Sequence, residues 1–366
     1  MKILIIANHY NTLRIFRREL IKEIAKEGHE VVVSIPACED EYKDVLESYG
    51  CTVKFIDSEF ERRETKISGE LKLIKAYRKI IAEEKPDKVI TYTLKCNIYG
   101  ALACKKYKVE HYANITGLGS TFYGGALIRT LISLLYRFSL NKSKRVFLEN
   151  TANRDLLVSK KIIKGETAVV LSGAGVNLDE FPASPYPDKD APTRFLFAAR
   201  IMREKGVDEY IDALTRVKAV YPDVQFDFIG WYEDDYEATV KDLEKRGLIN
   251  HFGFQPDVLP FIRNAHCTVL PSWHEGMSNT LLESASMCRA LIASDIHGCK
   301  EAIEDGVTGY VFEVKNADKL YDALIRFIEL PYEEKVLMGQ NGRKRMETIF
   351  DKKLVVSDTM KEIFED

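Results

Sequence analysis

The sequence lacks features that mark several classes of protein. It contains no uninterrupted apolar run near the roughly 18 residues of a membrane span, and its first apolar run, residues 3–7, is too short for a signal peptide. The seven cysteines are an odd number and include no Cys-x-x-Cys pair, so neither a disulfide framework nor a zinc site is expected. The net charge of −3 gives no bias toward nucleic acid. These absences predict a soluble globular protein of a reducing cytosol.

The length and the hydrophobic pattern predict the fold class. A chain of 366 residues favours two domains. Short β-branched runs alternate with longer amphipathic runs, a pattern typical of parallel α/β folds. Helices are predicted first at residues 13–26 and last at 318–329, 333–349 and 352–364. Strands are predicted at residues 2–7, 30–35, 52–56, 88–91, 110–115, 145–149 and 167–171, and then at 194–199, 225–229, 249–252, 267–270, 291–293 and 310–312.

A proline-rich stretch suggests where the two domains meet. Four prolines fall within residues 182–192, and proline fits neither a helix interior nor a central strand. We therefore predict a linker there. The resulting domains are residues 1–183 and 184–350, and the final stretch, residues 351–366, can pack back on the first. Two open parallel sheets that face each other would leave a central cleft, a favoured place for a ligand.

The segment SWHEGMSNTLLE, residues 272–283, is the strongest candidate site. It follows a predicted buried strand, at the strand end where open α/β sheets bind ligands. Glu275 lies in a glycine-containing loop, residues 278–280 can cap a helix, and Glu283 lies one turn into that helix. The helix start suits a phosphate, and the two carboxylates can hold hydroxyl groups on different parts of one ligand. Both could instead be solvated surface groups, but their context favours a nucleotide sugar.

Two cations stand in the first strand–helix loop of the second half. Arg200 ends a strand and Lys205 opens a helix, so both can point to the same sheet edge as Glu275. Together they can neutralise a diphosphate without a metal, Arg as a planar fork and Lys as a point charge. Two basic loop residues on their own are usually only solvated. The chain has no metal-ligand spacing such as His-x3-His, so no metal site is predicted.

Residues 126–145 are both apolar and basic. Two interpretations stay open: an amphipathic helix that lies on an anionic membrane, or a buried domain helix with a basic end. The preceding loop contains Gly117-x-Gly119-x-x-Phe122, which lacks the third glycine of a dinucleotide fingerprint and is not followed at once by a helix. We predict a ligand-facing loop there.

Several segments resemble those of glycosyltransferase family 4: ARIMREKG from residue 199, SWHEGMSNTLLE, ASDIHGCKEAI from residue 293 and EDGVTGY from residue 304. The segments ITGLG and FLEN, at residues 115 and 147, are similar to those of bacterial enzymes that extend polyprenyl-diphosphate-linked sugars for capsule, O-antigen or N-glycan assembly, including the diacetylbacillosaminyl-lipid N-acetylgalactosaminyltransferases. The resemblance implies a GT-B fold of two Rossmann-like domains. The second domain would hold a sugar-nucleotide donor and the first an acceptor.

The resemblance also implies roles for single residues. Arg200 and Lys205 match the pair that contacts the donor diphosphate, Glu275 matches the carboxylate on the donor sugar, and Glu283 the one on the ribose. The loop backbone would meet phosphate or sugar at Gly276, Met277, Ser278, Asn279 and Thr280. The family retains the anomeric configuration and needs neither a divalent metal nor another cofactor.

The acceptor side departs from many members of the family. Those members have a glycine-rich loop after the first strand and a histidine at the end of a first-domain strand. This chain has NHYNT at residues 8–12 and NITG at residues 114–117. The candidate acceptor residues by position are Asn8, His9, His111, Asn114, Thr116 and Gly117.

One main hypothesis and two alternatives follow. The main hypothesis is a retaining transferase that moves a hexose or N-acetylhexosamine from a UDP-sugar to a polyprenyl-diphosphate-linked saccharide, in surface polysaccharide or glycan assembly. It would act as a peripheral protein on the anionic inner face of the plasma membrane. The first alternative is a GT-B sugar-nucleotide epimerase or hydrolase that uses the same donor residues. The second is a non-catalytic sugar-nucleotide-binding subunit of an assembly complex.

Overall fold

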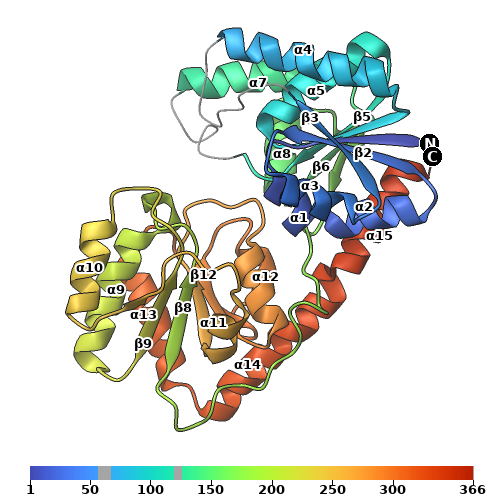
Figure 1. Ribbon diagram of the computed structural model, residues 1–366. Helices are drawn as coiled ribbons and strands as arrows, with labels where there is room; N and C mark the ends of the chain where they lie inside the picture. The colour runs from blue at the N-terminus through green and yellow to red at the C-terminus, as the bar shows by residue number, and fades with distance from the viewer. Residues whose placement is uncertain (57–66, 119–125, 366) are drawn as a thin grey trace. The chain divides into compact units, whose positions relative to one another are not determined.

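The chain forms two units, each built around its own parallel sheet. The computed structural model describes residues 1–56, 67–118 and 126–365 (Figure 1). Unit 1 comprises Met1–Ala174 and Lys353–Asp366, and unit 2 comprises Gly175–Lys352. The chain therefore passes from unit 1 to unit 2 after Ala174, earlier than the predicted boundary after residue 183. The cleft expected between the two sheets stays a prediction.

Unit 1 contains seven parallel strands in the order β3-β2-β1-β4-β5-β6-β7. In β1, Ile3 and Ile5 join one layer of the core, and Leu4 and Ile6 join the other. This alternation is the period of two of a strand whose two faces are both covered. The strands are β1 (Lys2–Ile6), β2 (Glu30–Pro36), β3 (Cys51–Ile56), β4 (Lys88–Tyr92), β5 (Glu110–Ile115), β6 (Arg145–Leu148) and β7 (Ala168–Val170).

Helices cover both faces of this sheet. One face carries α1 (Tyr10–Phe16), α2 (Arg18–Lys26), α3 (Asp40–Glu47) and the last helix, α15 (Lys352–Phe364). The other carries α4 (Ile67–Glu84), α5 (Leu94–Tyr107), α7 (Ala126–Leu140) and α8 (Thr151–Ser159). A single 3₁₀ turn, Gly165–Thr167, precedes β7.

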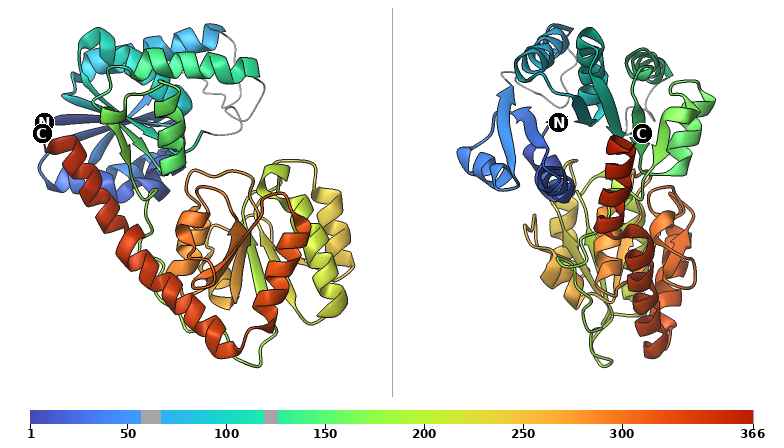
Figure 2. Two further views of the ribbon diagram at one scale, coloured as in Figure 1. Left: turned by 180° about the vertical axis from the view of Figure 1, so that it is seen from behind. Right: turned by 90° about the vertical axis from the view of Figure 1, so that its right-hand side faces the viewer.

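The C-terminal helix α15 is attached to unit 1 by polar contacts as well as by packing. The Lys88 ammonium donates to the carbonyl of Ile363 at 2.6 Å, and Arg145 Nε donates to Glu362 at 2.6 Å. The ring of Phe364 stacks on His29 with centroids 4.5 Å apart. Figure 2 shows α15 running along the sheet of unit 1. The structure thus places residues 353–366 with the first domain.

The single helix predicted at residues 13–26 is wrong, because the chain breaks at Arg17. This residue has φ −129° and ψ 6°, which ends α1 and begins α2. Its guanidinium is buried, 3.3 Å from Glu149 and 4.8 Å above the ring of Tyr92. A buried ion pair of this kind holds a local backbone conformation that the hydrophobic period does not reveal.

Unit 2 repeats the architecture with six parallel strands in the order β10-β9-β8-β11-β12-β13. They are β8 (Arg194–Ala198), β9 (Gln225–Ile229), β10 (Asn250–His251), β11 (Cys267–Leu270), β12 (Ala290–Ser294) and β13 (Gly309–Phe312). Each of the thirteen strands predicted from the sequence is present, with ends shifted by a few residues. The prediction of two Rossmann-like parallel-sheet domains is confirmed.

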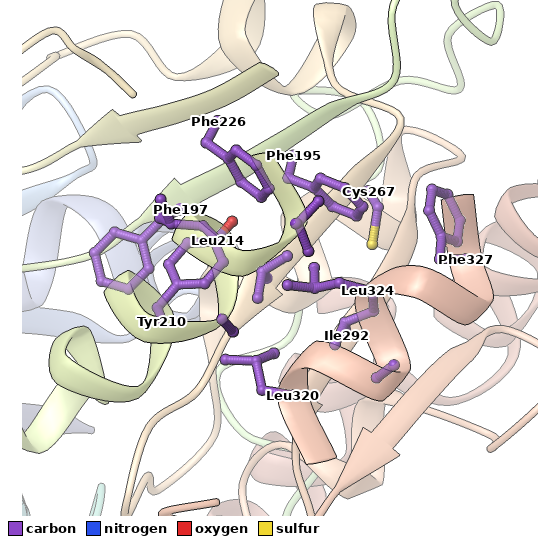
Figure 3. Close-up of a cluster of buried hydrophobic side chains, with 14 of the residues drawn as sticks. Phe195, Phe197, Tyr210, Leu214, Phe226, Cys267, Ile292, Leu320, Leu324 and Phe327 are labelled. Atoms are coloured by element: carbon purple, nitrogen blue, oxygen red, sulfur yellow. The ribbon is translucent and has the colours of Figure 1, made fainter. Parts of the chain in front are cut away.

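Aromatic side chains fill the core on one face of this second sheet (Figure 3). Phe195 stacks on Phe226, and Phe197 stacks on Phe228, with ring centroids 5.3 and 4.9 Å apart. Tyr210 of α9 stacks on Phe228 at 5.3 Å. This face is covered by α9 (Val207–Val220), α10 (Glu237–Lys245) and α13 (Ala317–Glu329), and the other by α11 (Leu259–Asn264) and α12 (Asn279–Ser286). α14 (Tyr332–Arg345) and a π-helical turn, Met346–Phe350, lead to α15.

The proline-rich stretch at residues 182–192, predicted to be a linker, belongs to unit 2. Arg289 is fully buried and donates to the carbonyls of Ser184 and Pro185 at 3.3 and 2.8 Å. The hydroxyl of Tyr186 donates to the carbonyl of His266 at 2.8 Å. Prolines leave carbonyls that accept hydrogen bonds, so a segment that cannot join a sheet is still fixed along its surface.

Candidate functional site

The candidate donor residues lie at the carboxyl edge of the sheet in unit 2. β8 is central, with β9 on one side and β11 on the other. The loop after β8 carries Arg200 and Lys205, and the loop after β11 carries Glu275. Parallel strands bring these loops to the same edge, which is where open α/β sheets bind ligands.

Arg200 is held by a carboxylate from the neighbouring loop. Its guanidinium lies 3.6 Å from Glu233, which follows β9, and its side chain is 30% exposed. The same carboxylate accepts a hydrogen bond from the indole of Trp231 at 3.3 Å. Glu233 therefore orients Arg200 while the guanidinium stays open to solvent.

Lys205 and Glu275 form an ion pair across two loops. The Lys205 ammonium contacts Oε1 of Glu275, and the hydroxyl of Ser272 donates to that oxygen at 2.8 Å. The two side chains are 17% and 14% exposed. The backbone N–H of Trp273 donates to the carbonyl of Glu204 at 2.9 Å, which ties the loops together. The predicted convergence of Lys205 and Glu275 is thus present in the structure.

A glycine makes this approach between the loops possible. Gly206 follows Lys205 with φ +73°, a region that only glycine enters without strain. A Cβ at this position would lie 2.0 Å from the carbonyl oxygen of Pro271. The close contact brings the end of the first loop against the start of the second.

The start of α12 is fixed between β8 and the loop after β12. The hydroxyl of Ser278 accepts from the N–H of Leu281 at 3.4 Å, as a helix cap does. The hydroxyl of Thr280 donates to the carbonyl of Ala198 at 3.0 Å. Gly276 and Asn279 are half-buried and Met277 is buried. The helix start therefore faces the same edge as Arg200, with its positive dipole end there.

Gly298, in the loop after β12, supports Glu275 from the other side. Its φ is +92°, and a Cβ there would lie 2.7 Å from the Cβ of Glu275 and 2.6 Å from the carbonyl oxygen of Gly276. Its carbonyl accepts from the N–H of Ser278 at 2.8 Å. Its own N–H donates to Glu301 at 2.6 Å. The position of Glu275 thus depends on a residue that has no side chain.

Glu283 has a different environment from the other three candidates. It lies on α12, and burial raises the pKa of its carboxyl to about 7. Lys352 lowers that pKa and Glu180 raises it, both to a smaller extent than burial. A carboxyl with this pKa changes its charge near neutral pH.

Two residues that support this edge were not among the predicted site residues. Glu233 positions Arg200 and Gly298 positions Glu275, yet each is a common residue type in a loop. Ser272, which donates to Glu275, lies within the predicted segment but was given no role. The signal that could have indicated Gly298 is its place after a predicted strand of the same sheet. Nothing in the residue pattern distinguishes Glu233 from neighbouring acidic residues.

The candidate acceptor residues of unit 1 fall into two groups. Asn8, His9, Thr116 and Gly117 lie just beyond the carboxyl ends of β1 and β5. His9 caps α1, because its Nδ1 accepts from the N–H of Asn11 at 3.1 Å. Gly117 has φ +142°. This first group lies at the edge expected for a ligand-facing loop. The remainder of that loop, including Gly119 and Phe122, lies outside the described residues.

His111 belongs to the second group and its proposed acceptor role is not supported. It is buried within β5, with Nδ1 2.8 Å from the hydroxyl of Ser143 and Nε2 2.9 Å from that of Thr91. Burial lowers the pKa of the imidazole to about 3, so the ring is neutral. With both nitrogens engaged inside the sheet, it has no open side for an acceptor.

Asn114 shares this buried network. Its side chain donates to the carbonyl of Thr91 at 3.3 Å, and its own carbonyl accepts from Asn97 at 2.8 Å. The Thr91 hydroxyl donates to Asn97 at 2.7 Å. These bonds fix the ends of β4 and β5, so Asn114 supports the edge and does not project from it.

In the described residues, 1–56, 67–118 and 126–365, no group of three His, Cys, Asp or Glu side chains is arranged to hold a metal ion. Within the same ranges, no helix is both long and apolar enough to cross a membrane. The expected independence of metal stays a prediction.

Two family models match the chain. One, described as glycosyl transferase 4-like, matches residues 2–150. The other, described as glycosyl transferases group 1, matches residues 183–345. The two matches fall on the two sheets, in the order that the resemblance implied.

Curated relatives and solved structures agree with this assignment. The chain is 27% identical over 330 residues to the N,N'-diacetylbacillosaminyl-diphospho-undecaprenol alpha-1,3-N-acetylgalactosaminyltransferase of Campylobacter jejuni, covering 86% of each protein. It is 24% identical to the UDP-Gal:alpha-D-GlcNAc-diphosphoundecaprenol alpha-1,3-galactosyltransferase of Escherichia coli, over 78% of this chain and 76% of that one. The crystal structure of Anabaena HepE in complex with UDP and glucose superposes with a TM-score of 0.79 at 16% identity, over 99% of each chain. The chain therefore belongs to the family 4 glycosyltransferases of GT-B fold.

Proposed function

We propose that the protein is a retaining, metal-independent glycosyltransferase that moves a hexose or N-acetylhexosamine from a UDP-sugar to a polyprenyl-diphosphate-linked saccharide. The observation that carries the proposal is the Lys205–Glu275 pair, which lies with Arg200 at one sheet edge. Two cations that can bind a diphosphate, Arg200 and Lys205, thus share this edge with a carboxylate that can bind a sugar, Glu275. The printed names of the relatives from C. jejuni and E. coli, both with undecaprenol-linked substrates, support the acceptor class.

In the proposed reaction, the two cations stabilise the leaving UDP. Negative charge grows on the diphosphate as the bond to the sugar breaks, and fixed positive groups act most strongly on charge that develops in the transition state. Arg200 and Lys205 take this role, supported by the backbone of residues 276–280. Glu275 accepts hydrogen bonds from the sugar hydroxyls and Glu283 from the ribose.

The acceptor hydroxyl attacks from the face that the diphosphate leaves. A phosphate oxygen of the departing UDP takes the proton, so no side chain of unit 1 needs to act as a base. This agrees with the neutral, fully engaged state of His111. The polyprenyl chain of the acceptor would keep the reaction at the inner face of the plasma membrane, with the protein as a peripheral partner.

The test is turnover of the purified full chain with a panel of UDP-sugars and a short-chain polyprenyl-diphosphate sugar. UDP release together with an elongated lipid product supports the proposal, and an α linkage in the product by NMR supports retention. An unchanged rate in excess EDTA supports metal independence. Free sugar without lipid product would instead indicate a hydrolase, and no UDP release with any donor would refute the proposal.

Donor binding can be measured separately from turnover. The chain has two tryptophans, and both, Trp231 and Trp273, lie in loops at the carboxyl edge of unit 2. Intrinsic fluorescence therefore reports on that edge. Titration with UDP and with GDP should change it for UDP only. Binding without turnover on any acceptor would favour a non-catalytic subunit.

A further inference from the structure

The helix α7 carries large apolar side chains that point away from the core. Ile128, Leu131, Leu134 and Phe138 are 51%, 57%, 57% and 66% exposed. At about 100° per residue, these four positions fall within an arc of about 120° on the helix. Tyr136, on another face, is buried in the core of unit 1. The helix is therefore apolar on two faces, of which one packs inside and one points outward.

Exposed cations lie on the same helix and just after it. Arg137 lies about 60° beyond Leu134, at the border of the outward face. Arg129 lies on the side of Tyr136, and Lys142 follows the helix. The sequence contains no acidic residue between Glu110 and Glu149. The chain segment that contains the apolar stripe therefore carries charge of one sign, and it complements an anionic partner.

The neighbouring helix α5 adds to this charge. The ammonium of Lys105 lies 4.7 Å from the centre of the Phe138 ring and donates to the carbonyl of Phe138. Burial lowers the pKa of Lys105, and the nearby charge of Lys142 lowers it further. Lys106 and Tyr107 of α5 are exposed beside it. Figure 2 shows α7 on the outer side of unit 1, beside α5.

We propose that this docking face, formed by Ile128, Leu131, Leu134 and Phe138, holds unit 1 on an anionic lipid bilayer. The helix would lie in the plane of the surface, its apolar stripe at the boundary of headgroups and acyl chains and its cations on lipid phosphates. At 15 residues it is too short to span the bilayer. The inference specifies the membrane contact of the proposed function and rests on that function only for its biological setting.

The experiment measures partition of the purified full chain onto vesicles by co-sedimentation, with neither donor nor acceptor present. One set of vesicles is phosphatidylcholine alone, and the other contains about a quarter phosphatidylglycerol. The wild-type chain should partition several-fold more strongly onto the anionic set, and added salt should weaken that binding. Leu131→Ser should lower the partition coefficient about tenfold, because one leucine less enters the bilayer. Arg137→Gln should lower it about fivefold.

Matched variants in unit 2 provide the controls. Leu337 on α14 is 54% exposed, close to the 57% of Leu131, so Leu337→Ser removes equal apolar surface elsewhere. Arg246 at the end of α10 is exposed, so Arg246→Gln removes one surface charge. Both should bind vesicles as the wild type does, and all four variants should keep the wild-type unfolding temperature. If the control variants lost as much vesicle binding as the test variants, the proposed docking face would be wrong.

Other outcomes also decide the question. Absence of wild-type binding to anionic vesicles, or equal binding to both sets, would overturn the proposal. If the wild-type chain were a dimer that does not bind vesicles, and Leu131→Ser converted it to a monomer, the docking face would be a contact between protein chains. Turnover on a short-chain acceptor free of vesicles should be the same for Leu131→Ser and wild type. Loss of turnover in both would count against the proposed reaction and leave the docking result unaffected.

Discussion

The first six strands of unit 1 follow the same order as the six strands of unit 2, yet the side chains beyond the carboxyl ends of the strands differ between the two sheets. β1 and β8 occupy the same place in their sheets. The loop after β8 supplies Arg200 and Lys205, whereas the loop after β1 supplies Asn8 and His9. The two candidate residues after β8 are therefore cations, whereas the two after β1 carry amide and imidazole side chains.

The next strands along extend the contrast. Glu275 follows β11 in unit 2 and pairs with Lys205, whereas β4 and β5 of unit 1 end in a buried network that includes Thr91 and Asn114. Topology fixes where a ligand can bind, and the side chains at the strand ends fix what kind of ligand it is. Paired charges suit a diphosphate and a sugar, and uncharged polar side chains suit a saccharide.

Removing the charged pair of unit 2 is the strongest test of this contrast. Lys205→Ala and Glu275→Ala should each lower turnover about 10²- to 10³-fold, the cost of losing one group that stabilises charge in a transition state. The fold should survive, since both groups are at the edge of the sheet. Steady-state UDP release is the measurement.

The exposed pair Lys241–Glu237 on α10 provides the control, since its ammonium and carboxylate are 2.6 Å apart but far along the chain from the candidate residues. Lys241→Ala should leave turnover unchanged. An equal rate for Lys205→Ala and Lys241→Ala would remove the charged edge from the mechanism.

Gly298→Ala should have the next largest effect, through the position of Glu275. The new Cβ would be 2.7 Å from the Cβ of Glu275, at a backbone φ of +92° that alanine rarely adopts. A displaced catalytic group lowers the rate steeply, so turnover should fall about 10- to 100-fold. Gly247→Ala is the matched control, because φ is +67° there and nothing lies within 4 Å of the new Cβ. If both variants lose activity equally, backbone strain and not the contact with Glu275 is responsible.

The sequence was sufficient for the architecture, and it also indicated that three charged candidate residues share one sheet edge. Short β-branched runs located each strand of the described residues, because both faces of each sheet are buried and such strands are apolar along their length. Arg200, Lys205 and Glu275 were found because they follow strands of one sheet. Contacts that depend on tertiary packing, such as the one between Glu233 and Arg200, could not be predicted from the sequence pattern. Gly298 was missed for the same reason.

The errors have a similar origin. His111 was named as the histidine nearest to the strand end where many family members have one, although two hydroxyls from distant segments engage it inside the sheet. The proline-rich stretch has a composition typical of linkers, but Arg289 attaches it to unit 2. In both cases a side chain remote in sequence decides the outcome.

Donor binding should depend on pH through Glu283. Burial raises the pKa of Glu283 to about 7. An ionised carboxylate accepts two hydrogen bonds, so donor affinity should rise with pH through 7, by about tenfold between pH 6 and 8. Fluorescence titration with UDP measures the affinity, and Glu283→Gln should make it independent of pH in this range. A parallel pH profile in the variant would show that another group titrates.

The same carboxyl has an opposite effect on folding. Its pKa is 4.5 in the unfolded chain and higher in the fold, so the folded state binds more protons between these values. The contribution of this carboxyl to stability should therefore fall as the pH rises from 4.5 to 7, and Glu283→Gln should remove that part of the pH dependence. Urea unfolding at several pH values separates this effect from donor binding.

His111 should show the smallest effect on turnover and so sharpens the contrast from the side of unit 1. Its pKa is lowered to about 3 in the fold against 6.5 for the free side chain, so the unfolded chain binds more protons between these values. The contribution of His111 to stability should consequently fall as the pH drops below 6.5. His111→Ala should remove that contribution and cost about 2–4 kcal/mol at neutral pH, since it leaves a cavity and takes one hydrogen-bond partner from each of two hydroxyls. Turnover of the folded variant should equal that of the wild type, because a neutral, enclosed imidazole neither binds the saccharide nor takes its proton.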